Sequence, residues 1–273
     1  MKLKNAYEKA SALLSEANID EAQFKALCIV CHASEIKNSS FFAHAEDETD
    51  FDKIDSLLSR IIKGEPLQYV IGFWDFYESV FKVGEGVLIP RPETEELVEL
   101  ALDSAKKLKA PVIFDLCAGS GCIGISLAKK LADSTVYCIE KSEKAYYYLS
   151  ENAKDCENVR CICGDIISGE FDLPCADIIV SNPPYIKSGE ISSLQNEVLF
   201  EPVMALDGGD DGLTFYRVIN ERWHSRLKEG GLLLLEIGNE QGDDVKSLLT
   251  NFKDIRVIKD IYGNDRMVSA VRR

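Results

Sequence analysis

The chain has 273 residues, enough for one large domain and one small domain. Its 46 acidic side chains outnumber its 31 basic ones, and the resulting net charge of −15 should repel a polyanion such as DNA. No apolar run approaches the ~20 residues that a membrane span needs, and the N-terminus lacks the apolar core of a signal peptide. We therefore expect a cytoplasmic protein with no DNA partner and no membrane contact.

The nine cysteines are an odd number in a long chain without a secretion signal, which predicts reduced thiols. The segment Cys28-Ile29-Val30-Cys31-His32 matches the attachment pattern of haem c. We interpret both of its cysteines as core residues on the apolar face of a helix. Because the three histidines are scattered along the chain, we expect no metal site.

Residues 1–72 are predicted to form a small helical domain, because apolar residues recur there at helical spacing. Asp20 followed by Gln23 resembles a capping box at the start of one helix. The domain carries no group of chemically active residues, so we expect it either to contact a partner or substrate or to serve as a scaffold. Residues 73–92 should form a hairpin around Gly84-Glu85-Gly86 and then a linker that prolines stiffen.

Residues 93–273 form the predicted larger domain, in which strands alternate with helices from Pro111 onward. This alternation indicates a parallel sheet. Strands are expected at 112–116, 135–139, 159–162, 178–181, 232–237, 255–258 and 267–271, with helices at about 212–228 and 241–249. Because only a short turn separates the last two strands, they should pair antiparallel. The expected fold class is α/β, with a Rossmann-like seven-stranded sheet whose last strand is antiparallel and a small N-terminal helical bundle.

The segment Asn182-Pro183-Pro184-Tyr185 ends the fourth of these strands. Two consecutive prolines lack N–H donors and restrict the residues before them, so the chain leaves the sheet as a stiff loop. Open α/β sheets bind ligands at the carboxyl ends of their strands. The side-chain oxygen of Asn182 and the backbone oxygen of Pro183 are two acceptors beside the Tyr185 ring. This combination is suited to binding a planar –NH2 group.

A glycine-rich turn follows the first predicted strand and opens a helix. Gly119-Ser120-Gly121-Cys122-Ile123-Gly124 fits the G-x-G-x-x-G pattern, and acidic Glu140 follows one strand later. Glycines let the backbone approach a ligand closely, and the helix N-terminus offers free N–H groups. Glu140 could bind the two hydroxyl groups of any adenosine ribose. The pattern therefore fits NAD as well as S-adenosylmethionine.

Two acidic residues favour S-adenosylmethionine over a dinucleotide. Asp115 at the first strand end would repel a pyrophosphate but attract the ammonium group of a methionine moiety. Asp165, which closes the third strand, is suited to accept an adenine amino group while Ile166 packs on the ring.

Together these motifs resemble the class I S-adenosylmethionine-dependent methyltransferases that act on planar nitrogens. Three further segments resemble the HemK/PrmC family within that class: Pro66-Leu67-Gln68-Tyr69, Ile89-Pro90-Arg91-Pro92-Glu93-Thr94-Glu95 and Leu206-Asp207-Gly208-Gly209-Asp210-Asp211-Gly212. The resemblance extends over the whole chain. It implies cofactor-binding roles for Asp115, Cys117, Ala118, Gly119, Ser120, Gly121, Glu140, Asp165, Ile166 and Asn182. The chain departs from the pattern at Cys117, where many methyltransferases have the first glycine of the turn.

The resemblance implies transfer of a methyl group to N5 of the glutamine in the Gly-Gly-Gln motif of class-1 peptide chain release factors. The cofactor S-adenosylmethionine would leave as S-adenosylhomocysteine. Asn182, Pro183 and Tyr185 would be catalytic, Pro184 would complete the substrate site, and the enzyme is expected to be a monomer. The alternatives are a ribosomal-protein glutamine methyltransferase, a DNA adenine N6-methyltransferase, a dehydrogenase and a non-catalytic adaptor.

Overall fold

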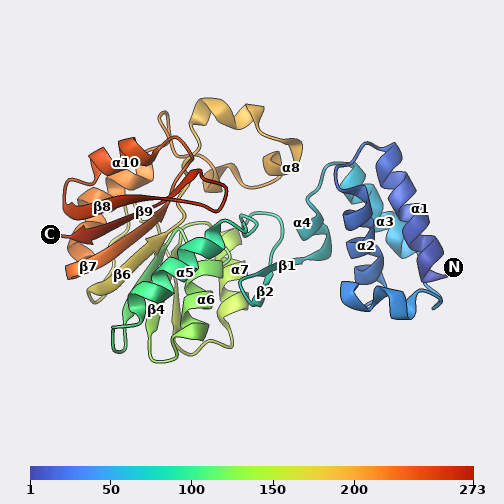
Figure 1. Cartoon of the computed structure of the whole chain (residues 1–273), viewed down its shortest axis with the longest axis horizontal. Coiled ribbons are helices and arrows are strands. Elements are labelled where there is room, and N and C mark those ends of the chain that lie inside the picture. The colour runs from blue at the N-terminus through green and yellow to red at the C-terminus, as the bar shows by residue number, and fades with distance from the viewer. The chain divides into compact units, whose positions relative to one another are not determined.

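The computed structural model describes residues 1–273, and the chain divides into two compact units. The first unit comprises Met1–Phe73 together with Gln195–Phe200, a short segment that lies far away in the sequence. The second unit comprises Trp74–Leu194 and Glu201–Arg273. Figure 1 shows residues 1–73 of the first unit in blue to teal and its segment α8 in orange, and the second unit runs from teal to red. No helix combines the length and the apolar character that crossing a bilayer would require.

The first unit is built from helices, as the apolar spacing predicts. Its elements are α1 (Leu3–Glu16), α2 (Ala22–Ala33), the 3₁₀ helix η1 (Asn38–His44), α3 (Phe51–Ile62), α4 (Leu67–Ile71) and, from the distant segment, α8 (Asn196–Leu199). Cys28 and Cys31 are buried on α2, where both pack as core residues. The predicted capping box is wrong. Glu21, in the left-handed conformation with φ 53°, precedes α2 and makes no side-chain cap.

A two-stranded hairpin opens the second unit, but its turn is not where the glycines predict it. Strands β1 (Phe73–Phe76) and β2 (Ser79–Lys82) are joined by Tyr77 and Glu78, at φ 50° and φ 21°. Positive φ at both central positions matches the right-handed twist of paired strands, even without glycine. The predicted turn at Gly84–Gly86 instead follows the hairpin and leads into the linker.

The seven-stranded sheet of the second unit confirms the predicted fold class. Its strands are β3 (Val112–Leu116), β4 (Thr135–Glu140), β5 (Val159–Cys163), β6 (Ala176–Ser181), β7 (Leu227–Glu236), β8 (Phe252–Lys259) and β9 (Asp265–Arg272). They lie in the order β5-β4-β3-β6-β7-β9-β8, and β9 is antiparallel to both of its neighbours. The order reverses between β3 and β6, which is where open α/β sheets bind ligands.

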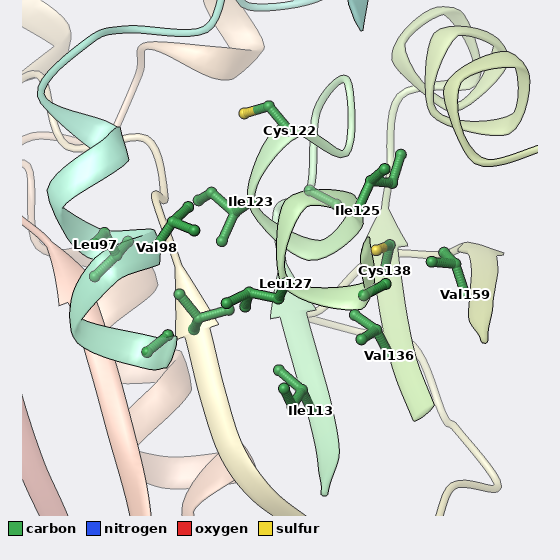
Figure 2. Packing of buried hydrophobic residues seen from close by; sticks show 14 of the residues in the cluster. Leu97, Val98, Ile113, Cys122, Ile123, Ile125, Leu127, Val136, Cys138 and Val159 are labelled. Carbon is green, nitrogen blue, oxygen red and sulfur yellow. The ribbon is translucent and has the colours of Figure 1, made fainter. Parts of the chain in front are cut away.

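Helices cover both faces of this sheet. Helices α5 (Thr94–Ala105), α6 (Cys122–Lys130) and α7 (Glu143–Ala153) cover one face, and their side chains meet alternate strand residues in one core. Figure 2 shows Leu97 and Val98 of α5, Ile123 and Leu127 of α6, and Ile113 of β3 in this layer. Helices α9 (Thr214–Val218) and α10 (Gly242–Leu248) pack into the core on the opposite face.

Two predicted segments differ from the structure. The expected helix at 212–228 consists of α9, a π-helical turn η4 (Ile219–Trp223) and a 3₁₀ turn η5 (His224–Arg226). Strand β7 then begins at Leu227, five residues before the predicted start. The polar stretch after Asn182-Pro183-Pro184-Tyr185 contains the short 3₁₀ helices η2 (Ser188–Ser193) and η3 (Val203–Ala205).

Candidate active site

One cavity of the second unit, of about 880 Å³ including its open mouth, lies at the carboxyl edge of the parallel strands. It is lined by the turn after β3, the ends of β4, β5 and β6, the linker before α5 and the loop that contains η3. Eight of the predicted site residues line it: Cys117, Ala118, Gly119, Ser120, Glu140, Asp165, Ile166 and Asn182. Pro184 lines it as well, whereas Asp115, Gly121, Pro183 and Tyr185 do not.

The turn after β3 needs residues that adopt the left-handed conformation. Cys117, Gly119 and Gly121 have φ values of 59°, 57° and 81°. Glycine adopts this conformation without strain, whereas a side chain such as that of Cys117 costs roughly 1 kcal/mol. Gly124 has a different role, because a Cβ atom there would collide with Cys138 on the neighbouring strand. The four positions therefore shape the turn and allow α6 to pack closely on the sheet.

Asp115 lies beneath the cavity, not in it. Its position on β3 turns the side chain toward α6, where Oδ2 accepts a hydrogen bond of 2.8 Å from the N–H of Gly124. Its other oxygen, Oδ1, is buried without a partner, and burial raises the pKa of this carboxyl to about 7. The attraction of Asp115 for a cofactor ammonium group stays a prediction, and any such attraction would act from outside the cavity lining. The residue anchors the first turn of α6.

Glu140, at the end of β4, connects the glycine turn to the start of α7. Its Oε2 accepts from the N–H of Gly119 at 2.8 Å, and its Oε1 accepts from the N–H of Ser142 at 2.7 Å. Burial raises its pKa, although these backbone donors favour the charged form. A carboxylate has about four lone-pair sites. Glu140 can therefore hold the turn and still accept two hydroxyl groups from the cavity.

Asp165 and Ile166 follow β5. The Asp165 carboxylate accepts from the N–H of Ile167 at 2.9 Å and from the Ser168 hydroxyl at 3.0 Å, and it pairs with Lys141 at 3.1 Å. Partial burial would raise its pKa, but these partners together keep the pKa below its ordinary value. Asp165 is thus an ionised acceptor at the cavity wall, beside the buried apolar side chain of Ile166.

The loop after β6 is fixed at its first residues. The Ser181 hydroxyl donates to the Leu116 backbone oxygen at 2.6 Å, which ties the end of β6 to β3. The next residue, Asn182, is half-buried and lines the cavity, and its Nδ2 donates to the Thr94 hydroxyl at 3.2 Å. The Asn182 amide oxygen is therefore left to accept from a ligand. Tyr185 packs into the core on the α9 side, and burial raises its pKa to about 12.

The glycine-rich segment Leu206–Gly212 supports this loop. A Cβ atom on Gly208 or on Gly212 would collide with the Tyr185 backbone. The Gln241 side chain also donates to the Tyr185 backbone oxygen at 3.0 Å. The conformation of the loop is thus restrained by its own prolines and by the packing of Gly208, Gly212 and Gln241 against its backbone. The sequence contains the glycines, but it does not show which backbone they pack against.

Several cavity residues were missed by sequence reasoning. Thr94 begins α5, and its hydroxyl donates to the buried Glu236 at the end of β7 at 2.6 Å. Glu201 binds the Arg91 guanidinium and also accepts from the N–H of Ile89 at 2.9 Å, which connects the proline-rich linker to the loop around η3. That loop closes one wall through Pro202, Met204 and Ala205. In the sequence, only the position of Arg91 between Pro90 and Pro92 pointed to its contact with Glu201.

The chemistry of the lining residues fits an adenosine-containing cofactor. The buried Ser120 hydroxyl lines the cavity without a hydrogen-bond partner, and Glu140 and Asp165 supply acceptors at two neighbouring strand ends. All nine cysteines are free thiols. No three His, Cys, Asp or Glu side chains gather as a metal site would require.

Both units of the chain contain a segment that matches a known protein family. A family model described as the PrmC N-terminal domain matches residues 5–72, and one described as the methyltransferase small domain matches residues 97–261. The dehydrogenase interpretation of the glycine turn is therefore wrong. Among solved structures, the hMettl16 catalytic domain aligns with a TM-score of 0.56 at 12% identity, covering 70% of this chain and 75% of that one. This likeness shows the fold alone.

Two relatives in particular match over almost their whole length. The release factor glutamine methyltransferase of Thermodesulfovibrio yellowstonii is 43% identical over 260 residues, which cover 92% of this chain and 91% of the relative. The protein of the same name from Clostridium acetobutylicum is 34% identical over 282 residues, which cover 100% and 99%. The chain belongs to the family of release factor glutamine methyltransferases.

Proposed function

We propose that this chain transfers a methyl group from S-adenosylmethionine to the side-chain amide nitrogen of glutamine in the Gly-Gly-Gln motif of class-1 peptide chain release factors. The observation that carries the proposal is the position of Asn182. Its half-buried amide lies at the end of β6, in the same cavity as the glycine turn and Glu140, with its Nδ2 already engaged. The names of the relatives support the substrate. The cytoplasmic location and the monomeric state stay predictions.

The cofactor, when bound, supplies an electrophilic methyl group on a sulfonium. Glu140 would accept the ribose hydroxyls, Asp165 the adenine amino group, and Ile166 would pack on the adenine ring. The glycine turn would approach the methionine end closely, and the orphaned Ser120 hydroxyl is available there as a donor. These roles would put the cofactor next to Asn182, because Glu140, Asp165, Ile166, Gly119 and Ser120 line the same cavity as Asn182.

Asn182 and Pro183 would orient the glutamine amide. An amide nitrogen is a weak nucleophile, because its lone pair is delocalised into the carbonyl group. The Asn182 Oδ1 and the Pro183 backbone oxygen would accept the two N–H groups and aim the nitrogen at the methyl group. Partial positive charge then develops on that nitrogen beside fixed acceptors, which stabilise the transition state electrostatically. Holding the two reactants in line supplies a further large share of the rate. Tyr185 packs into the core on the α9 side and does not line the cavity, so its predicted contact with the amide is not part of this proposal.

The acidic composition supports a protein substrate over a nucleic acid. With a net charge of −15, the chain would repel the phosphate backbone over most of its surface. This weighs against DNA adenine methylation, which would use the same Asn-Pro-Pro-Tyr loop.

The experiment that tests the proposal is methyl transfer from labelled S-adenosylmethionine to a purified class-1 release factor. Mass spectrometry should find one added methyl group on the Gly-Gly-Gln glutamine, and a release factor with that glutamine changed to alanine should stay unlabelled. Label in a ribosomal protein but not in the release factor would contradict the substrate.

Asn182→Ala tests the role of the loop in the same assay. It should abolish transfer while isothermal titration calorimetry still detects S-adenosylmethionine binding. Retained turnover in Asn182→Ala would refute the role of the amide.

A further inference from the structure

The Asn182 amide has two orientations of nearly the same shape, and they have opposite chemistry. With Nδ2 toward Thr94, as in this structure, Oδ1 remains as an acceptor for the substrate. In the reversed orientation the amide would present N–H donors to a substrate that also brings N–H donors. The rate of transfer therefore depends on what holds the amide in the first orientation.

Thr94 determines this orientation through its single hydroxyl hydrogen. That hydrogen is donated to Glu236 Oε2 at 2.6 Å, so the Thr94 oxygen can only accept in its contact of 3.2 Å with Asn182 Nδ2. An acceptor at that place binds the Nδ2 side of the amide and disfavours the Oδ1 side. The direction of the whole chain of hydrogen bonds therefore originates at the Glu236 carboxylate.

Both supporting residues are buried, and both are part of rigid elements. Thr94 and Glu236 each expose only 2% of their surface. Thr94 is the first residue of α5, Glu236 is the last residue of β7, and Asn182 follows β6, the strand next to β7. The three side chains thus meet at the carboxyl edge of the sheet. A buried polar chain of this kind is held with little freedom to rearrange.

We propose that Thr94 and Glu236 are positioning residues for methyl transfer, which together hold the Asn182 amide oxygen toward the substrate nitrogen. This inference rests on the proposed function, because it assumes that Asn182 accepts from the substrate amide. Glu236 does not line the cavity, so it acts through Thr94 and through its own contact with the Asn182 side chain.

The arrangement requires Glu236 to be ionised. A protonated Glu236 donates to the Thr94 oxygen, which releases the threonine hydrogen to be donated to Asn182 Oδ1 and so favours the reversed amide. Burial, with a smaller contribution from Glu93, raises the pKa of Glu236, while the Thr94 hydroxyl, Arg266 and Asn182 lower it; the net pKa is about 7. The titratable or charged groups facing Glu236 are Arg266 of β9, Glu93 before α5, Tyr185 after β6, Tyr216 of α9 and Cys122 of α6.

The first test compares kcat and KM of Thr94 variants with labelled S-adenosylmethionine and a purified class-1 release factor. Thr94→Val should lower kcat on the order of 100-fold, as a misplaced catalytic group does, while calorimetry shows cofactor binding within about threefold of the unchanged enzyme. Thr94→Ser keeps the hydroxyl and should restore most of kcat.

A matched control is Thr250→Val. Its hydroxyl accepts from the Asn220 amide at 3.4 Å, which is the same type of pair outside the cavity, and its kcat should be unchanged. A kcat of Thr94→Val within about threefold of the unchanged enzyme would overturn the proposal.

The second test measures how kcat depends on pH. Replacing a residue with a merely structural role would leave this pH dependence unchanged. The unchanged enzyme should lose kcat about tenfold per pH unit below about pH 7, as Glu236 takes up a proton. Glu236→Gln cannot titrate, so this acid limb should be absent. An identical acid limb in Glu236→Gln would overturn the proposal and assign the limb to another group, such as the buried Asp115.

Asn182→Ala separates the two proposals. If Asn182→Ala is inactive and Thr94→Val is fully active, only the positioning role fails. If Asn182→Ala itself turns over, the proposed function of the amide fails.

Discussion

Replacing Glu236 by glutamine should change how the stability of the larger unit depends on pH. Glu236 is buried at the end of β7, and its burial raises the pKa from 4.5 to about 7. Glutamine has nearly the same shape, keeps an oxygen that can accept from the Thr94 hydroxyl, and has no proton to titrate. The substitution therefore isolates the cost of ionising this carboxyl inside the protein.

The sign and the size of the effect follow from proton linkage. Below pH 4.5 the folded and unfolded states both hold the proton, whereas between pH 4.5 and about 7 only the folded state does. Raising the pH through this window therefore favours the unfolded state. At about 1.4 kcal/mol per pH unit, the full loss of stability is about 3 kcal/mol, of which roughly 2.5 kcal/mol falls between pH 5 and pH 8. The Glu236→Gln variant has no proton to titrate at this position, so its stability does not fall for this reason.

Urea unfolding at pH 5, 6, 7 and 8 measures the effect. The only two tryptophans, Trp74 and Trp223, both belong to the larger unit, so their fluorescence reports its unfolding alone. The free energy of unfolding of Glu236→Gln, minus that of the unchanged protein, should rise by roughly 2.5 kcal/mol from pH 5 to pH 8. Asp115 titrates in both proteins and cancels in this difference. Parallel pH dependences of the two proteins would refute the reasoning.

Four further substitutions test Glu140 and the turn after β3. Glu140→Gln should weaken S-adenosylmethionine binding about 10- to 100-fold in calorimetry, because hydrogen bonds to a charged acceptor contribute about 1.5–3 kcal/mol; unchanged affinity would contradict the ribose contact. Cys117→Gly should raise the free energy of unfolding by about 1 kcal/mol in urea, because φ 59° strains any residue with a Cβ atom; a loss would show that its side-chain packing outweighs this strain. Gly124→Ala should lower the free energy of urea unfolding by about 1–3 kcal/mol, because the new methyl group would meet Cys138; Gly119→Ala meets no atom within 4 Å but has φ 57°, so it measures the left-handed strain of about 1 kcal/mol without crowding.

The sheet could be predicted from the sequence, because its strands are buried on both faces. A short continuous apolar run such as Ile178-Ile179-Val180 is typical of a fully buried strand. Glycine marks the turn after β3, and proline marks the turn after β6. Strand β3 appears with the predicted bounds. Strand β7 begins earlier than predicted, because its first residues are mostly exposed and polar and carry no apolar pattern.

The sequence mispredicts the hairpin turn and the start of α2 because, at both places, a residue other than glycine adopts a positive φ. Tyr77 and Glu78 form the hairpin turn at positive φ, although three nearby residues, Gly84-Glu85-Gly86, offer the usual turn chemistry. Pairing of the flanking strands β1 and β2 decides the turn position, and tertiary contacts override the local preference for glycine. Glu21 before α2 is a similar case, since it is left-handed without being glycine or asparagine.

The positioning of Asn182 shows most clearly what a sequence cannot give. The Asn-Pro-Pro-Tyr motif predicts where the amide lies, but not which of its two ends faces the substrate. That choice depends on Thr94, 88 positions away from Asn182, and on Glu236, 142 positions away from Thr94. Both residues look ordinary in the sequence: a threonine at a helix start and a glutamate at a strand end. Their function follows only from being buried together, because burial forces each donor to find an acceptor and so fixes the direction of the whole chain.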